Sequence, residues 1–80
     1  ADASDFLIFP NPTSDFITIS SVDQTINEVM ILDISGRILI RNQPSNRGNI
    51  SLDLTGFSKG TYLVRLIGSF GSYTQKVIRN

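Results

Sequence analysis

The stretch Asn49-Ile50-Ser51-Leu52-Asp53-Leu54 alternates polar and aliphatic side chains without a break. Successive side chains of a β-strand point to opposite faces, so this period of two predicts a strand with one face in a hydrophobic core. The same alternation recurs at residues 61–66, where Tyr62, Val64 and Leu66 share one face. We therefore expect a core that is built from strands.

Short runs with this period fill the chain, and clusters of Asn, Ser, Gly and Pro separate them as turns do. No segment has the spacing of three and four residues that marks an amphipathic helix. The pattern predicts about seven strands, at residues 6–9, 15–20, 27–33, 37–41, 48–54, 61–67 and 72–79. Such short antiparallel strands are typical of an all-β, immunoglobulin-like or fibronectin-III-like β-sandwich.

Composition excludes several classes of partner. The 80 residues suffice for one domain, and seven Lys and Arg balance seven Asp and Glu. Zero net charge argues against nucleic acid, which requires a basic surface. No apolar run approaches the roughly 20 residues that cross a bilayer, so no transmembrane segment is predicted. The first residues also lack the basic and apolar parts of a signal peptide.

The charges are distributed unevenly along the chain. Six of the seven acidic residues precede Arg37, and all seven basic residues lie at or after it. One interpretation is that paired strands carry complementary charges. The other is a polarised surface whose basic half faces an acidic partner.

Chemistry that needs His or Cys is excluded, because the chain contains neither. This removes Ser–His and Cys–His nucleophiles and the usual zinc ligand sets. We expect no catalytic residue, no cofactor and no metal site, with calcium on Asp23, Asp33 and Asp53 as the alternative to test. Phe70 and Tyr73, near the last predicted loop, are candidates either for stacking on a sugar or for anchoring that loop.

The predicted strands also have hydrophobic residues on their second face. The alternation predicts that one set of residues faces inward: Val29, Ile31, Ile38, Ile40, Val64 and Leu66. It predicts that the residues between them face outward: Met30, Leu32, Leu39, Leu63 and Ile78. Adjacent outward aliphatic residues form a docking patch for a host domain, a receptor or a second copy in a homodimer. The alternative is a register slip of one residue, which exchanges the two faces of a strand.

Four motifs follow one another along the chain. They are Phe9-Pro10-Asn11-Pro12-Thr13, then Leu32-Asp33-Ile34-Ser35-Gly36-Arg37, then residues 54–65 (LTGFSKGTYLVR), and finally Lys76-Val77-Ile78-Arg79. In this order and spacing they resemble the type A C-terminal sorting domain of type IX (Por) secretion system cargo proteins from Bacteroidota. One departure is that Asn80 follows Arg79, whereas the family tail usually has a basic residue at or very near its end.

The resemblance implies an immunoglobulin-like sandwich at residues 6–80, with residues 1–5 as a linker from an upstream cargo domain. It implies a non-catalytic secretion signal that an outer-membrane translocon recognises after the cargo reaches the periplasm. The resemblance also implies that a sortase-like peptidase commonly removes such a domain at the cell surface, where the cargo is often anchored or released. By position, the signal residues are Pro10, Asn11, Pro12, Asp33, Gly36, Arg37, Gly60, Tyr62, Lys76, Val77, Ile78 and Arg79.

Two other functions fit an all-β chain without catalytic residues. One is an accessory carbohydrate-binding or adhesive module of an extracellular enzyme, against which the absence of Trp counts. The other is a structural cap that stabilises a neighbouring domain by covering its apolar face. Three measurements distinguish the three functions: export of the cargo for a sorting signal, binding of a sugar for a carbohydrate-binding module, and thermal stability of the cargo for a structural cap.

Overall fold

The strands of the computed structural model, which describes residues 5–21, 24–44 and 49–80, agree with those predicted. They are β1 (Phe6–Phe9), β2 (Phe16–Ser21), β3 (Ile26–Asp33), β4 (Ile38–Asn42), β5 (Ile50–Asp53), β6 (Gly60–Gly68) and β7 (Gly71–Arg79). Each boundary lies within two residues of the predicted one, so the hydrophobic runs and the turn residues between them located all seven strands.

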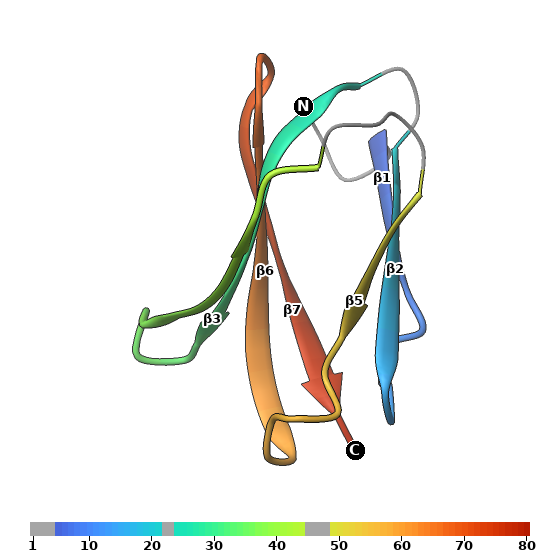
Figure 1. Cartoon of the computed structure of the whole chain (residues 1–80), viewed down its shortest axis with the longest axis vertical. Coiled ribbons are helices and arrows are strands. Elements are labelled where there is room, and N and C mark those ends of the chain that lie inside the picture. Colours follow the sequence, from blue (N-terminus) through green and yellow to red (C-terminus); the bar gives the residue numbers. More distant parts are fainter. Residues whose placement is uncertain (1–4, 22–23, 45–48) are drawn as a thin grey trace.

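The strands form two antiparallel sheets that face each other (Figure 1). One sheet has the order β1-β2-β5, and the other has the order β4-β3-β6-β7. The C-terminus lies at the end of the sandwich where β5 ends and β6 begins (Figure 1). Among the described residues, no helix is long and apolar enough to cross a membrane. The all-β sandwich is therefore confirmed.

The core lies between the sheets and is lined by buried residues of every strand except β4. Aliphatic side chains dominate it, as expected where β-branched residues pack on pleated surfaces. The buried cluster contains Phe6, Ile8, Ile17, Ile19, Ile26, Val29, Ile31, Ile50, Leu52, Leu54, Tyr62, Val64, Leu66 and Val77. Half-buried Leu39 and Ile40 of β4 pack against it.

The second face of the four-stranded sheet differs from the predicted docking patch. Met30 and Leu32 are only 5% and 4% exposed, and they lie on β3, an inner strand with β4 on one side and β6 on the other. Arg41 and Arg65 flank Met30 across the sheet. The prediction that Met30 and Leu32 form an exposed surface is therefore wrong.

A β-bulge explains the wrong assignment on β4. Ile31 pairs with Ile40, whereas the next residue of β3, Leu32, pairs with Ile38. Leu39 is left without an opposite residue, and it packs against the core instead of facing outward. Ile38, predicted to face inward, is 44% exposed. An extra residue in one strand exchanges the faces beyond it, so periodicity alone misplaced both side chains.

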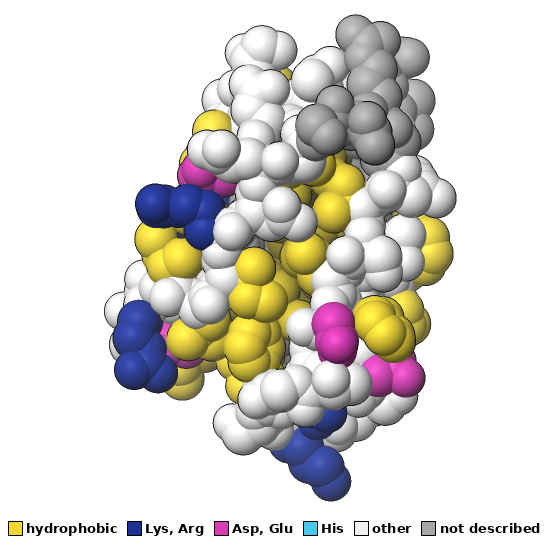
Figure 2. All heavy atoms as spheres, in the orientation of Figure 1, with side chains coloured by type: hydrophobic (Ala, Val, Ile, Leu, Met, Phe, Trp, Pro, Cys, Tyr) yellow, Lys and Arg dark blue, Asp and Glu magenta, His cyan; other side chains and the backbone are white. Residues whose placement is uncertain are grey.

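The uneven charges pair across the hairpin of β3 and β4. Arg37 Nε lies 3.2 Å from Asp33 Oδ2, and Arg41 Nε lies 3.8 Å from Glu28 Oε1. Figure 2 shows two groups of Lys and Arg side chains on this side of the molecule, each beside acidic side chains. In the described part of the chain, two acids before residue 37, Glu28 and Asp33, thus pair with later bases, which supports the interpretation of complementary strands.

Replacing a core leucine tests the assigned faces. Leu66 is fully buried, so Leu66→Ala should lower the free energy of unfolding by about 2–5 kcal/mol. Leu7 is 59% exposed, so Leu7→Ala should change that free energy by less than about 0.5 kcal/mol. Urea denaturation of residues 1–80 measures both values, and equal losses would contradict the sandwich.

Candidate functional site

The side chain of Asn11 lies along the last strand, β7. Its Nδ2 donates to the C=O of Lys76 at 3.1 Å, and its Oδ1 accepts from the N–H of Ile78, also at 3.1 Å. A residue of a parallel strand would bridge the same two groups, so the Asn11 amide substitutes for a backbone peptide. The flanking Phe9–Pro10 and Asn11–Pro12 peptide bonds are both cis.

Thr13 repeats this pattern two residues later with its own backbone. Its N–H donates to the C=O of Ile78 at 2.9 Å, and its C=O accepts from the N–H of Asn80 at 2.8 Å. These bonds form a parallel bridge between Thr13 and Arg79. We call Asn11 and Thr13, with the four hydrogen bonds that they make to β7 and Asn80, the terminal clamp.

The hydroxyl of Thr13 fixes the clamp to β2. It donates to the C=O of Phe16 and accepts from the N–H of Asp15 at 3.3 Å. Thr13 is the buried polar residue of the described chain, and these bonds satisfy its side chain. Burying a hydroxyl is unfavourable unless it is hydrogen-bonded, so these bonds allow Thr13 to occupy this position.

The terminal motif has an inner and an outer side. Val77 is fully buried in the core, and the Arg79 Nε donates to the C=O of Leu54 at 2.8 Å. Lys76 and Ile78, which alternate with them, are exposed. The four predicted signal residues of this motif thus divide into two that attach β7 to the sandwich and two that face solvent.

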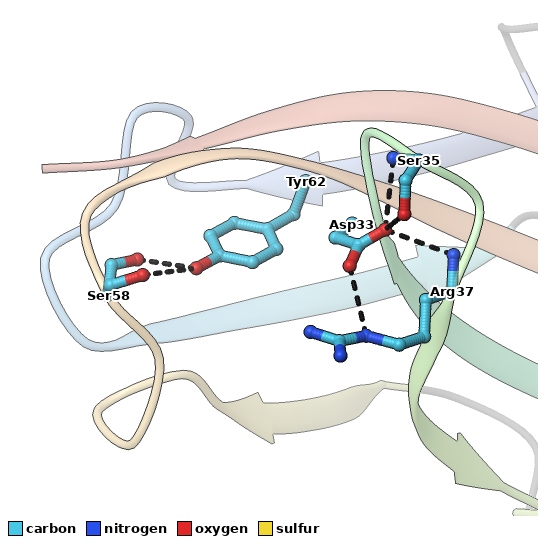
Figure 3. Close-up of polar contacts among 5 residues, drawn as sticks. All are labelled: Asp33, Ser35, Arg37, Ser58 and Tyr62. Carbon is cyan, nitrogen blue, oxygen red and sulfur yellow. Dashed lines mark hydrogen bonds and ion pairs between the residues drawn. The ribbon is translucent and has the colours of Figure 1, made fainter.

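The hairpin between β3 and β4 is organised by the carboxylate of Asp33 (Figure 3). Its Oδ1 accepts from the hydroxyl and the N–H of Ser35 and from the N–H of Arg37, the last two at 3.0 Å. The bond from the Ser35 hydroxyl, followed by that from the Arg37 N–H, lowers the pKa of Asp33 below its ordinary value of 3.8. Gly36 has a φ of +94°, which side chains other than hydrogen rarely allow.

Tyr62 is fixed by the turn that precedes β6. Its hydroxyl donates to the C=O of Ser58, four residues earlier (Figure 3). The tyrosine corner of immunoglobulin-like domains makes the same type of bond. The ring stacks on Phe57 with centroids 5.4 Å apart, and Gly60, the first residue of β6, has a φ of +153°. Tyr62 is thus a buried residue that attaches the turn to the sheet.

The sheet brings the predicted motifs to one end of the sandwich. Asp33 lies opposite Tyr62, and Tyr62 lies opposite Val77, so three motifs share one row across β3, β6 and β7. The terminal clamp adds the first motif beyond β7. Thr13 was not predicted as a signal residue from the sequence. Its position at the end of the first motif was the one feature that could have pointed to it.

Two alternative sites receive no support from the described residues. Phe70 and Tyr73 both pack on Phe6, at centroid distances of 5.0 and 5.1 Å, as anchors of the loop. The Asp53 carboxylate is hydrogen-bonded by its own turn through Thr55, which lowers its pKa. Within residues 5–21, 24–44 and 49–80, no group of three His, Cys, Asp or Glu could hold a metal. Asp23 lies outside the described residues.

The Asp33 hairpin predicts a pH-dependent stability. A carboxyl whose pKa is lowered by folding stabilises the protein above its unfolded pKa, and this stabilisation is lost as pH falls through the folded pKa. Asp33→Ala should therefore lower the melting temperature at pH 7, with a smaller difference from the unmodified chain at about pH 2. Melting curves of both chains, recorded at several pH values between about 2 and 7, measure this difference in melting temperature. A difference that does not change with pH would contradict the assigned hydrogen bonds.

Comparisons with known proteins agree with the four motifs. A family model described as a secretion system C-terminal sorting domain matches residues 7–80. The chain is 28% identical over 89 residues to Karilysin of Tannerella forsythia. The match covers 95% of this chain but only 18% of Karilysin, so the chain spans about a fifth of that relative. The chain belongs to the family of secretion system C-terminal sorting domains and is a signal for type IX secretion.

Proposed function

We propose that residues 6–80 are recognised as a folded domain by an outer-membrane translocon of the type IX system. A sorting signal of this kind is non-catalytic, is attached to a cargo, and implies a secreted or cell-surface protein. The observation that supports recognition of the folded domain is the meeting of all four motifs at the end of the sandwich that holds the C-terminus. An unfolded tail would not bring them together.

Within this surface, Lys76 and Ile78 are the residues that a partner contacts. Both are exposed and adjacent to the clamp, whereas Val77 is buried and the Arg79 Nε is bonded to the Leu54 C=O. A cation beside an exposed aliphatic side chain suits a partner surface with a carboxylate next to an apolar site. Asp33, Gly36, Gly60 and Tyr62 build the turns that support this end of the sandwich.

The remaining steps concern the cargo. Residues 1–5 are a linker from an upstream cargo domain, which passes through the periplasm before it crosses the outer membrane. A sortase-like peptidase removes residues 6–80 at the cell surface. A homodimer through the outer sheet face receives no support from the described residues, because Met30 and Leu32 in the middle of that face are buried. The packing of Phe70 and Tyr73 likewise disfavours a sugar-binding module.

Deletion of residues 76–80 tests the terminal signal. A passenger with a periplasmic signal peptide, fused to residues 1–80, should be exported by a host with the type IX system. Removing residues 76–80 should leave the passenger in the periplasm, as cell fractionation would show. Unchanged export after the deletion would refute the terminal signal.

A second variant separates recognition from folding. The deletion removes buried Val77, whereas Lys76→Glu with Ile78→Ser changes only exposed side chains and keeps every backbone hydrogen bond of β7. This double variant should reduce export severalfold without a change in melting temperature. Ser72→Glu, an exposed change at the other end of β7, is the matched control and should be exported normally.

A further inference from the structure

The terminal clamp connects the beginning of the domain to its end. Its two side-chain bonds join residues that are 65 and 67 positions apart. We propose that Asn11 is a positioning residue for the sorting signal: it fixes the terminal strand, so that the signal is presented only after the whole domain has folded. This inference rests on the proposed function, and it adds a residue that acts through β7 instead of contacting the translocon.

The chemistry of the contact explains why this residue is Asn. The clamp needs a donor for the C=O of Lys76 and an acceptor for the N–H of Ile78 on one short side chain. A carboxamide provides both, whereas an ionised carboxylate only accepts and an aliphatic side chain does neither. Asp at position 11 would keep the bond from Ile78 and place a negative oxygen against the C=O of Lys76.

The position of β7 explains why a clamp matters. β7 is an edge strand, paired on one side with β6, and the last residues of a chain are prone to fray unless they are attached. On the opposite edge, the clamp occupies the C=O of Lys76, both backbone groups of Ile78 and the N–H of Asn80. An uncovered edge would be a template for pairing with another strand.

The clamp therefore determines how a partner can recognise this end of β7. Because the C=O of Lys76, both backbone groups of Ile78 and the N–H of Asn80 are already bonded, a partner cannot pair with these groups without displacing Asn11 and Thr13. The side chains of Lys76 and Ile78 remain available in one fixed arrangement. A fixed arrangement loses less conformational entropy on binding, so a loosened terminus should be recognised less well.

Amide hydrogen exchange tests the structural half of the inference. Residues 1–80 contain one continuous core, so the chain is expected to fold alone and can be followed by NMR. In Asn11→Ala, the amide of Ile78 should exchange about tenfold faster, because its acceptor is lost. Core amides such as that of Val64 should keep their exchange rates, which shows that the variant is folded. In Asn11→Asp, the Ile78 amide should stay closer to the unmodified rate.

A matched control removes a comparable bond elsewhere. Ser21→Ala deletes one hydrogen bond, from the Ser21 hydroxyl to the C=O of Gln24 at 2.8 Å, at the end of β2 away from the clamp. It should leave the exchange rates of Ile78 and Asn80 unchanged. Export of the Ser21→Ala variant thus measures how a loss of stability away from the clamp affects export.

Export of the same variants tests the functional half. Passenger fusions with Asn11→Ala should be exported severalfold less than those with Ser21→Ala. Normal export with a loosened terminus would overturn the positioning role while leaving the deletion result, and so the proposed function, intact. Reduced export with unchanged exchange at Ile78 would also overturn it, because Asn11 would then be contacted directly. Normal export of the deletion variant would refute the proposed function itself, whatever the exchange rates.

Discussion

The hydrogen bonds from Asn11 and Thr13 to β7 hold this small domain together at its most vulnerable point. A chain of 80 residues buries a modest core, and this one has no disulfide to support it. The last strand lies at a sheet edge and ends at the C-terminus, where fraying is easiest. Three contacts reduce this fraying: the clamp, the burial of Val77 and the hydrogen bond from Arg79 to Leu54.

Residues predicted as part of the signal also build the fold. Asp33 closes a hairpin, Tyr62 attaches a turn to the sheet, and Val77 fills the core, and the three lie in one row. A motif shared across a family of sorting domains can thus have a structural cause at most of its positions. The proposed recognition then uses motif side chains that face solvent, of which Lys76 and Ile78 adjoin the clamp.

The alternation of hydrophobic residues predicted the positions of the strands, which depend on local sequence. It did not predict the side-chain positions that depend on tertiary contacts. The positions of the seven strands follow from short runs of mostly alternating hydrophobic residues and from the turn residues between them. The faces of Ile38 and Leu39 could not be predicted, since the bulge opposite Ile31 and Leu32 leaves no mark in the alternation. The burial of Met30 depends on neighbours from β4 and β6, and the contact of Asn11 with Ile78 spans the entire domain.

The most direct test of a clamped terminus is a through-space NMR measurement on residues 1–80. The side-chain amide protons of Asn11 should show nuclear Overhauser contacts with the backbone amide proton of Ile78, and residues 76–80 should have the dispersed shifts of a strand. Random-coil shifts for residues 76–80, without contacts to Asn11, would contradict the claim that the signal is part of the folded domain.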